Sequence, residues 1–345
     1  MKISLKQLAC DISEKEYRED SALSYSILSK YEKGGFGSIS KLYEQQESEA
    51  LTFGSMVDCL ITEGKEIFDS KFAVVSNIPS ESIEKIINQL VQTTDELSLS
   101  DISDNEILNV CDTLGYQTKW KAETRINKVR TEGTDYFFEL ANAKGKRIVD
   151  LESYQKAIDT VIALKSHPYV GKYFEEDSEY IEHLYQVKFK ETIDEIPLKC
   201  MFDLLIVNHK DGVIIPCDLK TSSVPEYDFA KKYLEWRYDI QSRLYYKILS
   251  KKLSENSYFK GFKLQPFRFI VINKNELNPL TFVDPYSIQQ NCDIKIKFKS
   301  ERVTILRDPV VIAKELNYYL VNGSKVPNTI NTNSLNYLNT EIEKL

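Results

Sequence analysis

The pattern of hydrophobic and polar residues predicts helices in the first half of the chain. Ser24 can cap a helix that ends at Gly34, because glycine readily adopts the backbone conformation that stops a helix. A second helix is predicted from about Glu47, with apolar residues at three-and-four spacing as far as Ile61. We expect these helices, within residues 1–65, to contribute to the core of the fold.

Residues 66–180 are mostly helical in pattern and richer in charge. The clearest helical segments are Ile83–Leu90, Asn105–Leu114 and Ser153–Leu164, and the breaks fall at Pro79, Gly115, Gly133 and Gly145. We expect this region to be a mainly helical insertion that forms a lobe over the core.

Four segments of the second half predict β-strands, and a helix interrupts them. The strands are Leu184–Lys190, Leu198–Val207, Val213–Thr221 and Phe267–Ile272. The helix spans about 228–250, and residues 209–212 form a tight turn between the second and third strands. We predict an α/β fold whose central mixed β-sheet, within 181–275, is flanked by helices. Residues 276–345 would form a C-terminal helical extension with a loosely ordered tail at 328–339.

The composition is that of an ordinary globular protein, with 42% hydrophobic and 28% charged residues. No apolar run approaches the roughly 20 residues of a membrane span, and the N-terminus lacks the apolar core of a secretory signal. Six scattered cysteines form no Cys-x-x-Cys pair, which argues against an iron–sulfur cluster or a zinc site. A Gly-x-x-x-x-Gly-Lys-Ser/Thr loop is absent, so no nucleotide cofactor is expected. We expect a cytoplasmic protein without membrane contact.

Two acidic residues and a lysine interrupt strongly apolar strand sequences, where an unpaired charge would be costly. With the 209–212 turn as hinge, Asp203 and Asp218 fall nearly opposite each other on antiparallel strands. Lys220 points to the same face as Asp218, because side chains alternate along a strand. Carboxylate oxygens suit Mg²⁺, and an ammonium group can orient or deprotonate an attacking water. The pattern therefore predicts that Mg²⁺, or Mn²⁺ in its place, binds between Asp203 and Asp218. The predicted reaction is hydrolysis of a phosphodiester bond.

Gln241 and Tyr245 lie four residues apart in the predicted helix, so both project from one helix face. An apolar stripe beside them would seat the helix on the sheet and turn both side chains toward the carboxylates. Glutamine and tyrosine are suited to contact a phosphate or a metal-bound water. We therefore predict that Gln241 and Tyr245 belong to the same site.

These residues resemble the motifs of the PD-(D/E)xK nuclease superfamily, in particular the RecB-like and exonuclease VIII (RecE-like) nucleases of phages and prophages. The resemblance rests on Asp203, then Asp218-Leu-Lys220, then Gln241-x-x-x-Tyr245, and on a segment Ser48–Asp58 that is similar to the entry helices of that group. The proline of the superfamily name is absent before Asp203, and Pro216 precedes Asp218 by two residues instead.

The resemblance implies a restriction-endonuclease-like core and a role for each matching residue. Asp203 and Asp218 would bind the metal, and Lys220 would position the water. Gln241 and Tyr245 would contact substrate or order the site. Asp58 stands where many relatives carry histidine, and it would be a third metal ligand or a group on the side of the base.

By the same resemblance, the function is that of a metal-dependent exonuclease on linear duplex DNA in phage-type recombination or DNA processing, in the host cytoplasm if phage-encoded. Such relatives work with a single-strand annealing protein and form homo-oligomers. A structure-specific or restriction-type endonuclease and a non-catalytic DNA-binding protein on a nuclease fold stay open as alternatives. A net charge of −7 requires a local basic surface for DNA, which the Lys and Arg residues between 231 and 268 would supply unless they form a solvated helix face.

Overall fold

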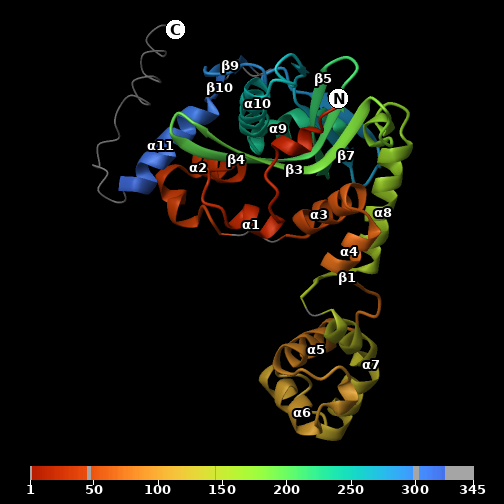
Figure 1. Cartoon of the computed structure of the whole chain (residues 1–345). Helices are drawn as coiled ribbons and strands as arrows, with labels where there is room; N and C mark the ends of the chain where they lie inside the picture. The colour runs from red at the N-terminus through yellow and green to blue at the C-terminus, as the bar shows by residue number, and fades with distance from the viewer. Residues whose placement is uncertain (1, 45–47, 144, 298–302, 323–345) are drawn as a thin grey trace.

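The computed structural model describes residues 2–44, 48–143, 145–297 and 303–322. It shows a body built around a β-sheet and a helical lobe that projects from the body (Figure 1). The tail predicted at 328–339 lies outside the described residues. Among the described residues, we find no helix with the length and apolar character that crossing a bilayer requires.

A mixed β-sheet forms the centre of the body, which confirms the predicted fold class. Its strands are β3 (Ile181–Ile193), β4 (Ile196–Asn208), β5 (Val213–Ser222), β6 (Lys263–Leu264), β7 (Arg268–Asn273) and β8 (Pro279–Val283). The strand order is β3-β4-β5-β7-β8, with β6 paired to β5. β5 runs parallel to β6 and β7, and the other neighbouring pairs are antiparallel.

Two tight turns set the pairing of β3, β4 and β5. Asp194 and Glu195 connect β3 to β4 with positive φ angles of 50° and 68°, as in the two-residue turns that match strand twist. The next hairpin pairs Asn208 with Val213, which is the register predicted from the 209–212 turn.

A fork opens in the sheet between β4 and β5. Leu204 and Cys217 form the last pair between these two strands. Beyond it, β5 continues to pair with β7 as far as Ser222. Asp203 and Asp218 are the residues that follow the last pair, so both lie at the opening of the fork.

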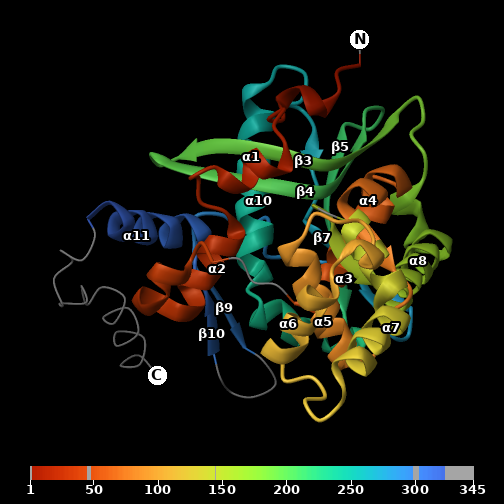
Figure 2. The ribbon, with the colours of Figure 1, turned by 90° about the horizontal axis from the view of Figure 1, so that it is seen from below.

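Helices surround the sheet (Figures 1 and 2), and two buried hydrophobic clusters attach them to it. The first, here the α10 cluster, joins α2 (Tyr25–Gly34), α9 (Phe229–Glu235), α10 (Tyr238–Glu255) and α11 (Pro309–Asn322) to the strands. The second, the α3 cluster, joins α3 (Glu49–Thr62), α4 (Lys65–Lys71) and α8 (Leu151–Ser166). Along β7, Phe269 and Val271 belong to the α10 cluster, whereas Ile270 and Ile272 belong to the α3 cluster. The two clusters therefore cover opposite faces of this strand.

The helix predicted at 228–250 is divided into α9 and α10. The two helices meet at Arg237, whose backbone is left-handed with φ 57° and ψ 45°. Its guanidinium donates hydrogen bonds to Glu32 on α2 (2.9 Å) and to Asp239 on α10 (2.9 and 3.1 Å). These ion pairs fix the start of α10 at a conformation that a non-glycine residue rarely adopts.

The projecting lobe consists of α5 (Glu81–Thr93), α6 (Asp104–Thr113) and α7 (Ala122–Asn142) around a hydrophobic cluster of its own. The helix break predicted at Gly133 is wrong, because this residue lies inside α7. A Cβ atom at position 133 would lie 2.5 Å from Cδ1 of Ile87 on α5. Glycine is therefore the residue that lets α5 and α7 approach each other this closely.

The lobe is smaller than the region 66–180 predicted for it. Its separate core extends from Val75 to Ala141. By contrast, α4 and α8 pack with α3, and the short strands β1 (Phe72–Val75) and β2 (Arg147–Asp150) pair in parallel at the neck of the lobe. Both ends of the insertion therefore begin at one two-stranded ribbon.

The C-terminal extension contains strands as well as a helix. In this extension, β9 (Ile294–Lys297) pairs with β10 (Val303–Leu306), and both precede α11 in the chain. At the other end of the chain, a short helix α1 (Glu14–Glu19) precedes α2. Arg243, on α10, is 0% exposed and holds the C-terminal extension against α10 by hydrogen bonds. Its guanidinium donates to the carbonyl oxygens of Gln289 (3.0 Å), Leu306 (3.3 Å) and Arg307 (3.1 Å).

Candidate functional site

Asp203 lies within β4, next to the last pair between β4 and β5 and so beside the fork. Its Oδ2 accepts a hydrogen bond of 2.9 Å from the backbone N–H of Leu219 on β5. Burial raises the pKa of the Asp203 carboxyl well above its ordinary value, and the negative charges of Asp218 and Asp58 raise it further. Three carboxylates from β4, β5 and α3 therefore interact electrostatically at this point.

Asp218 is 3% exposed and has two partners from the α10 side of the sheet. Its Oδ1 accepts a hydrogen bond of 2.6 Å from Nε2 of Gln241 on α10, and its Oδ2 forms an ion pair with Lys220. The structure thus places Asp218, Lys220 and Gln241 in contact. The contact follows from strand alternation for Lys220 and from the packing of α10 for Gln241.

Lys220 is enclosed by aromatic rings. Its Nζ lies 4.8 Å from the ring centroid of Tyr238 and 6.0 Å from that of Phe269. Burial alone would lower the pKa of Lys220, but the charges of Asp218 and Asp203 outweigh it and raise the pKa above its ordinary value. The ammonium group is therefore held in its charged form.

Asp58 reaches the site from α3. Its Oδ2 accepts a hydrogen bond of 2.8 Å from Nε2 of Gln186 on β3. Burial, followed by the charge of Asp218, raises the pKa of Asp58 to about 7. Gln186 was not predicted, because a glutamine in an alternating strand carries no signal in the sequence. Gln186 is distinguished from the other residues of β3 by its positive φ of 51°, which only the structure reveals.

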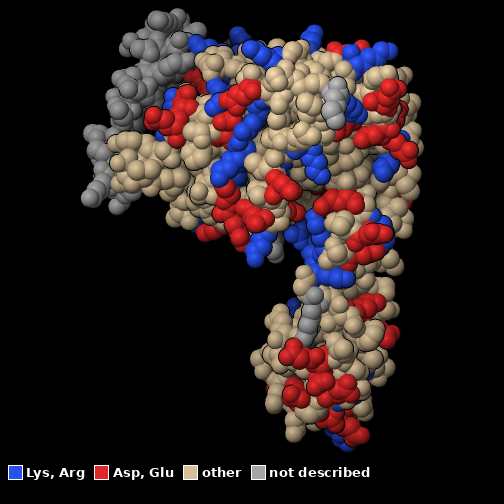
Figure 3. Space-filling model, in the orientation of Figure 1, with Lys and Arg blue, Asp and Glu red and all other residues tan. Residues whose placement is uncertain are grey.

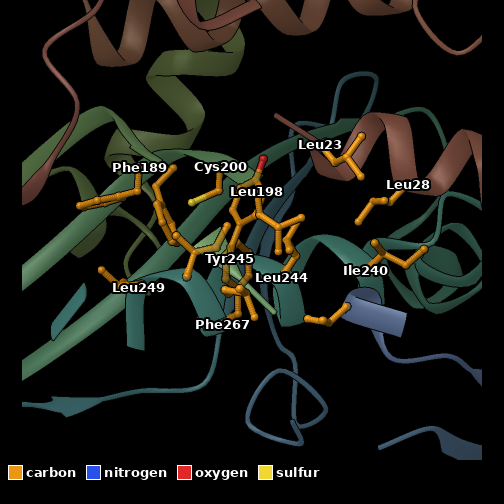
Figure 4. Close-up of a cluster of buried hydrophobic side chains, with 14 of the residues drawn as sticks. Leu23, Leu28, Phe189, Leu198, Cys200, Ile240, Leu244, Tyr245, Leu249 and Phe267 are labelled. Atoms are coloured by element: carbon orange, nitrogen blue, oxygen red, sulfur yellow. The ribbon is translucent and has the colours of Figure 1, made fainter. Parts of the chain in front are cut away.

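Tyr245 lies mainly among apolar side chains. Its ring is buried in the α10 cluster, where the centroids of Phe202 and Phe267 are 5.2 and 6.0 Å away (Figure 4). Tyr245 shares its helix with Gln241 and is buried, which limits direct contact with a substrate. Contact with a substrate and ordering of the site both stay predictions for Tyr245.

Several of the basic residues between 231 and 268 form ion pairs with acidic side chains. Lys231 pairs with Asp228, Lys232 with Glu235, Arg237 with Glu32 and Asp239, and Lys251 and Lys252 with Glu191. Arg243 is buried on backbone carbonyls. Neighbouring acids therefore balance part of the predicted patch, and a basic DNA surface in this region stays a prediction.

The donor set at the fork suits a hard divalent cation. Within the described residues, Asp58 Oδ1 and Gln241 Oε1 are buried and lack a hydrogen-bond donor. Buried oxygens of this kind need a positive partner, and Mg²⁺ commonly takes one or two carboxylates together with waters and substrate. A cage of protein ligands alone is not found, since the described part of the chain contains no group of three His, Cys, Asp or Glu side chains arranged to hold an ion.

A mixed sheet with two aspartates and a lysine at its fork defines a nuclease-like domain of the PD-(D/E)xK superfamily. The chain belongs to the family described as "PDDEXK-like domain of unknown function (DUF3799)", whose profile matches residues 24–284.

Among solved structures, the chain is similar to that of a "Putative exonuclease" from Eubacterium rectale. The two are 14% identical, the alignment covers 93% of this chain and 86% of the other, and the TM-score is 0.43. A similarity at this level carries no argument about function. No match was found among curated proteins.

Proposed function

We propose that this chain is a metal-dependent deoxyribonuclease that acts as an exonuclease on linear duplex DNA. The observation that supports it is the meeting of Asp203, Asp218 and Lys220 at the fork, with an unpartnered oxygen of Asp58 buried beside them. Family membership supports the nuclease class. The motif resemblance to exonuclease VIII supports the finer parts of the proposal, which are action on DNA ends in recombination, an annealing protein as partner and a homo-oligomeric assembly.

Asp203 and Asp218 would hold the cation, Mg²⁺ or Mn²⁺, with Asp58 as a further ligand. When bound, such a cation lowers the pKa of water and stabilises negative charge on a phosphate. Gln241 fixes the Asp218 carboxylate through Oδ1. Lys220, whose pKa the neighbouring carboxylates raise, would donate hydrogen bonds to the attacking water or to the phosphate oxygens.

The test is degradation of end-labelled linear duplex DNA, with closed circular DNA as a second substrate, in Mg²⁺, Mn²⁺ and EDTA. We expect metal-dependent loss of the linear substrate only. Asp218→Ala and Lys220→Ala should each reduce the rate by roughly 10²-fold or more, because each removes charge from the reacting centre. Asp159→Asn, at an exposed position of α8, is the matched control and should leave the rate unchanged.

Each other outcome would change the proposed activity or the role of a residue. Cutting of the closed circle would indicate an endonuclease. Binding of DNA without hydrolysis in either metal would indicate a non-catalytic DNA-binding protein on a nuclease fold. Near wild-type activity of Asp218→Ala would remove this residue from the reaction.

A further inference from the structure

Gln186 interrupts the regular geometry of a long strand. It lies in the middle of β3, between the pairs Tyr185–Leu204 and Val187–Phe202, and opposite Asp203. Its φ of 51° is left-handed, although every residue of an ordinary strand has a negative φ. Such a conformation carries an energetic cost for glutamine, and it persists where surrounding contacts impose it.

At the left-handed residue, the side chains of both β3 and β4 change from one face of the sheet to the other. Residues two apart in a strand normally face the same side of the sheet. Here Tyr185 packs against the α3 cluster, whereas Val187 belongs to the α10 cluster. Their partners Leu204 and Phe202 are divided between the two clusters in the same way. Side chains therefore change faces at the level of Gln186 and Asp203, next to the fork.

The side chain of Gln186 ends on a single carboxylate oxygen. Its Nε2 donates 2.8 Å to Oδ2 of Asp58 and leaves Oδ1 of the same carboxylate buried without a donor. An amide is neutral, so it can hold one oxygen without competing for a cation at the other. A lysine or an arginine in this place would neutralise the carboxylate instead.

We propose that Gln186 is a positioning residue for Asp58. It fixes one oxygen of the carboxylate so that the other remains available to a divalent cation, and the left-handed turn of β3 brings the amide to that oxygen. This inference rests on the proposed function. Residues that orient a metal ligand in this way typically change metal affinity by 10- to 100-fold when replaced.

The experiment separates the amide from the backbone by comparing Gln186→Met with Gln186→Gly. Both variants lose the N–H donor, but only glycine is free to adopt the left-handed backbone. Mn²⁺ affinity is measured by isothermal titration calorimetry, and folding by thermal unfolding without metal. We expect both variants to bind Mn²⁺ about 10-fold or more weakly. Gln186→Gly should unfold at a temperature equal to or above that of Gln186→Met.

A double-mutant cycle with Asp58→Asn completes the test, because residues that act through one another are not additive. Asp58→Asn alone should weaken Mn²⁺ binding, and adding Gln186→Met should cause little further loss. Affinity that follows stability, with Gln186→Gly binding like the wild type, would show a purely structural residue and overturn the proposal.

The wild-type protein distinguishes failure of this inference from failure of the proposed function. Wild-type Mn²⁺ binding and hydrolysis together with unchanged affinity in both Gln186 variants would overturn the role of Gln186 alone. A wild-type protein that binds no Mn²⁺ would overturn both.

Discussion

Burial at the fork makes the ionisation of the acidic residues interdependent. Asp203 and Asp218 lie at the opening of one fork, and the half-buried Lys220 forms an ion pair with Asp218. One ammonium cannot balance three carboxylates, which is why burial and mutual repulsion raise the pKa of Asp203 and of Asp58. A divalent cation would remove this imbalance, which supports the proposed metal site.

At the same scale, the packing of Tyr245 predicts what its replacement does. Tyr245→Phe should retain the nuclease activity and the stability of the wild type, because the ring fills the space between Phe202 and Phe267. Tyr245→Ala should lower the free energy of unfolding by about 3–5 kcal/mol, since it leaves a cavity. Both are measured by urea unfolding and by the rate of DNA degradation. Loss of activity in a stably folded Tyr245→Phe would instead show that the hydroxyl group of Tyr245 takes part in the reaction.

Most site residues could be predicted from the sequence, whereas their supporting partner could not. Asp203, Asp218 and Lys220 stand out because charged residues interrupt apolar strands, and a hairpin turn fixes their register. Gln186 is different, because its role depends on a left-handed backbone and on the position of α3. Neither leaves a pattern in the local sequence.

At the scale of elements, the four predicted strands and the hairpin between β4 and β5 match the structure, whereas the shorter strands and the helix boundaries that depend on tertiary contacts were missed. A glycine usually ends a helix, but Gly133 lies within α7 because the side chain of Ile87 occupies the space that a Cβ would need. The helix predicted as one at 228–250 is divided at Arg237, where ion pairs to α2 and α10 hold a left-handed residue. Both differences arise from contacts between elements far apart in the sequence.

The close approach of α5 and α7 gives a prediction for the lobe. Gly133→Val should destabilise it by about 1–3 kcal/mol, because the added methyl groups overlap with Ile87. Asn127→Val, at an exposed position of the same helix, is the control for the loss of helix propensity. Hydrogen exchange within α5–α7 measures the effect. Equal exchange in the two variants would show that α5 can move away from α7 at little cost.

At the scale of the whole molecule, the negative charge is concentrated in the lobe. Residues 76–142 contain 12 acidic and 6 basic residues, a net −6 out of −7 for the chain. Acidic side chains cover much of the lobe surface seen in Figure 3. A surface of this sign repels the DNA backbone, so we expect the lobe not to act as a clamp on the substrate.

Replacement of residues 77–142 by a Gly/Ser linker of about 12 residues tests this expectation. Because β1 and β2 are parallel, the linker must run from Val75 at the end of β1 back to Arg147 at the start of β2. Removal of the net negative charge should strengthen DNA binding roughly two- to tenfold at about 20 mM salt and have little effect at about 200 mM. Fluorescence anisotropy with a labelled duplex measures the affinity at both salt concentrations. Weaker binding at every salt concentration would mean that the lobe contacts DNA directly.

The contacts of Arg243 bear on where this domain can be cut. The family match ends at residue 284, yet the guanidinium of Arg243 is satisfied by carbonyl oxygens at 289, 306 and 307. A fragment trimmed to the matched residues would leave a charged group of α10 inside the protein with these acceptors gone. A fragment that folds by itself should therefore extend beyond residue 284. The position of α10, which carries Gln241, depends on a segment that the family profile does not include.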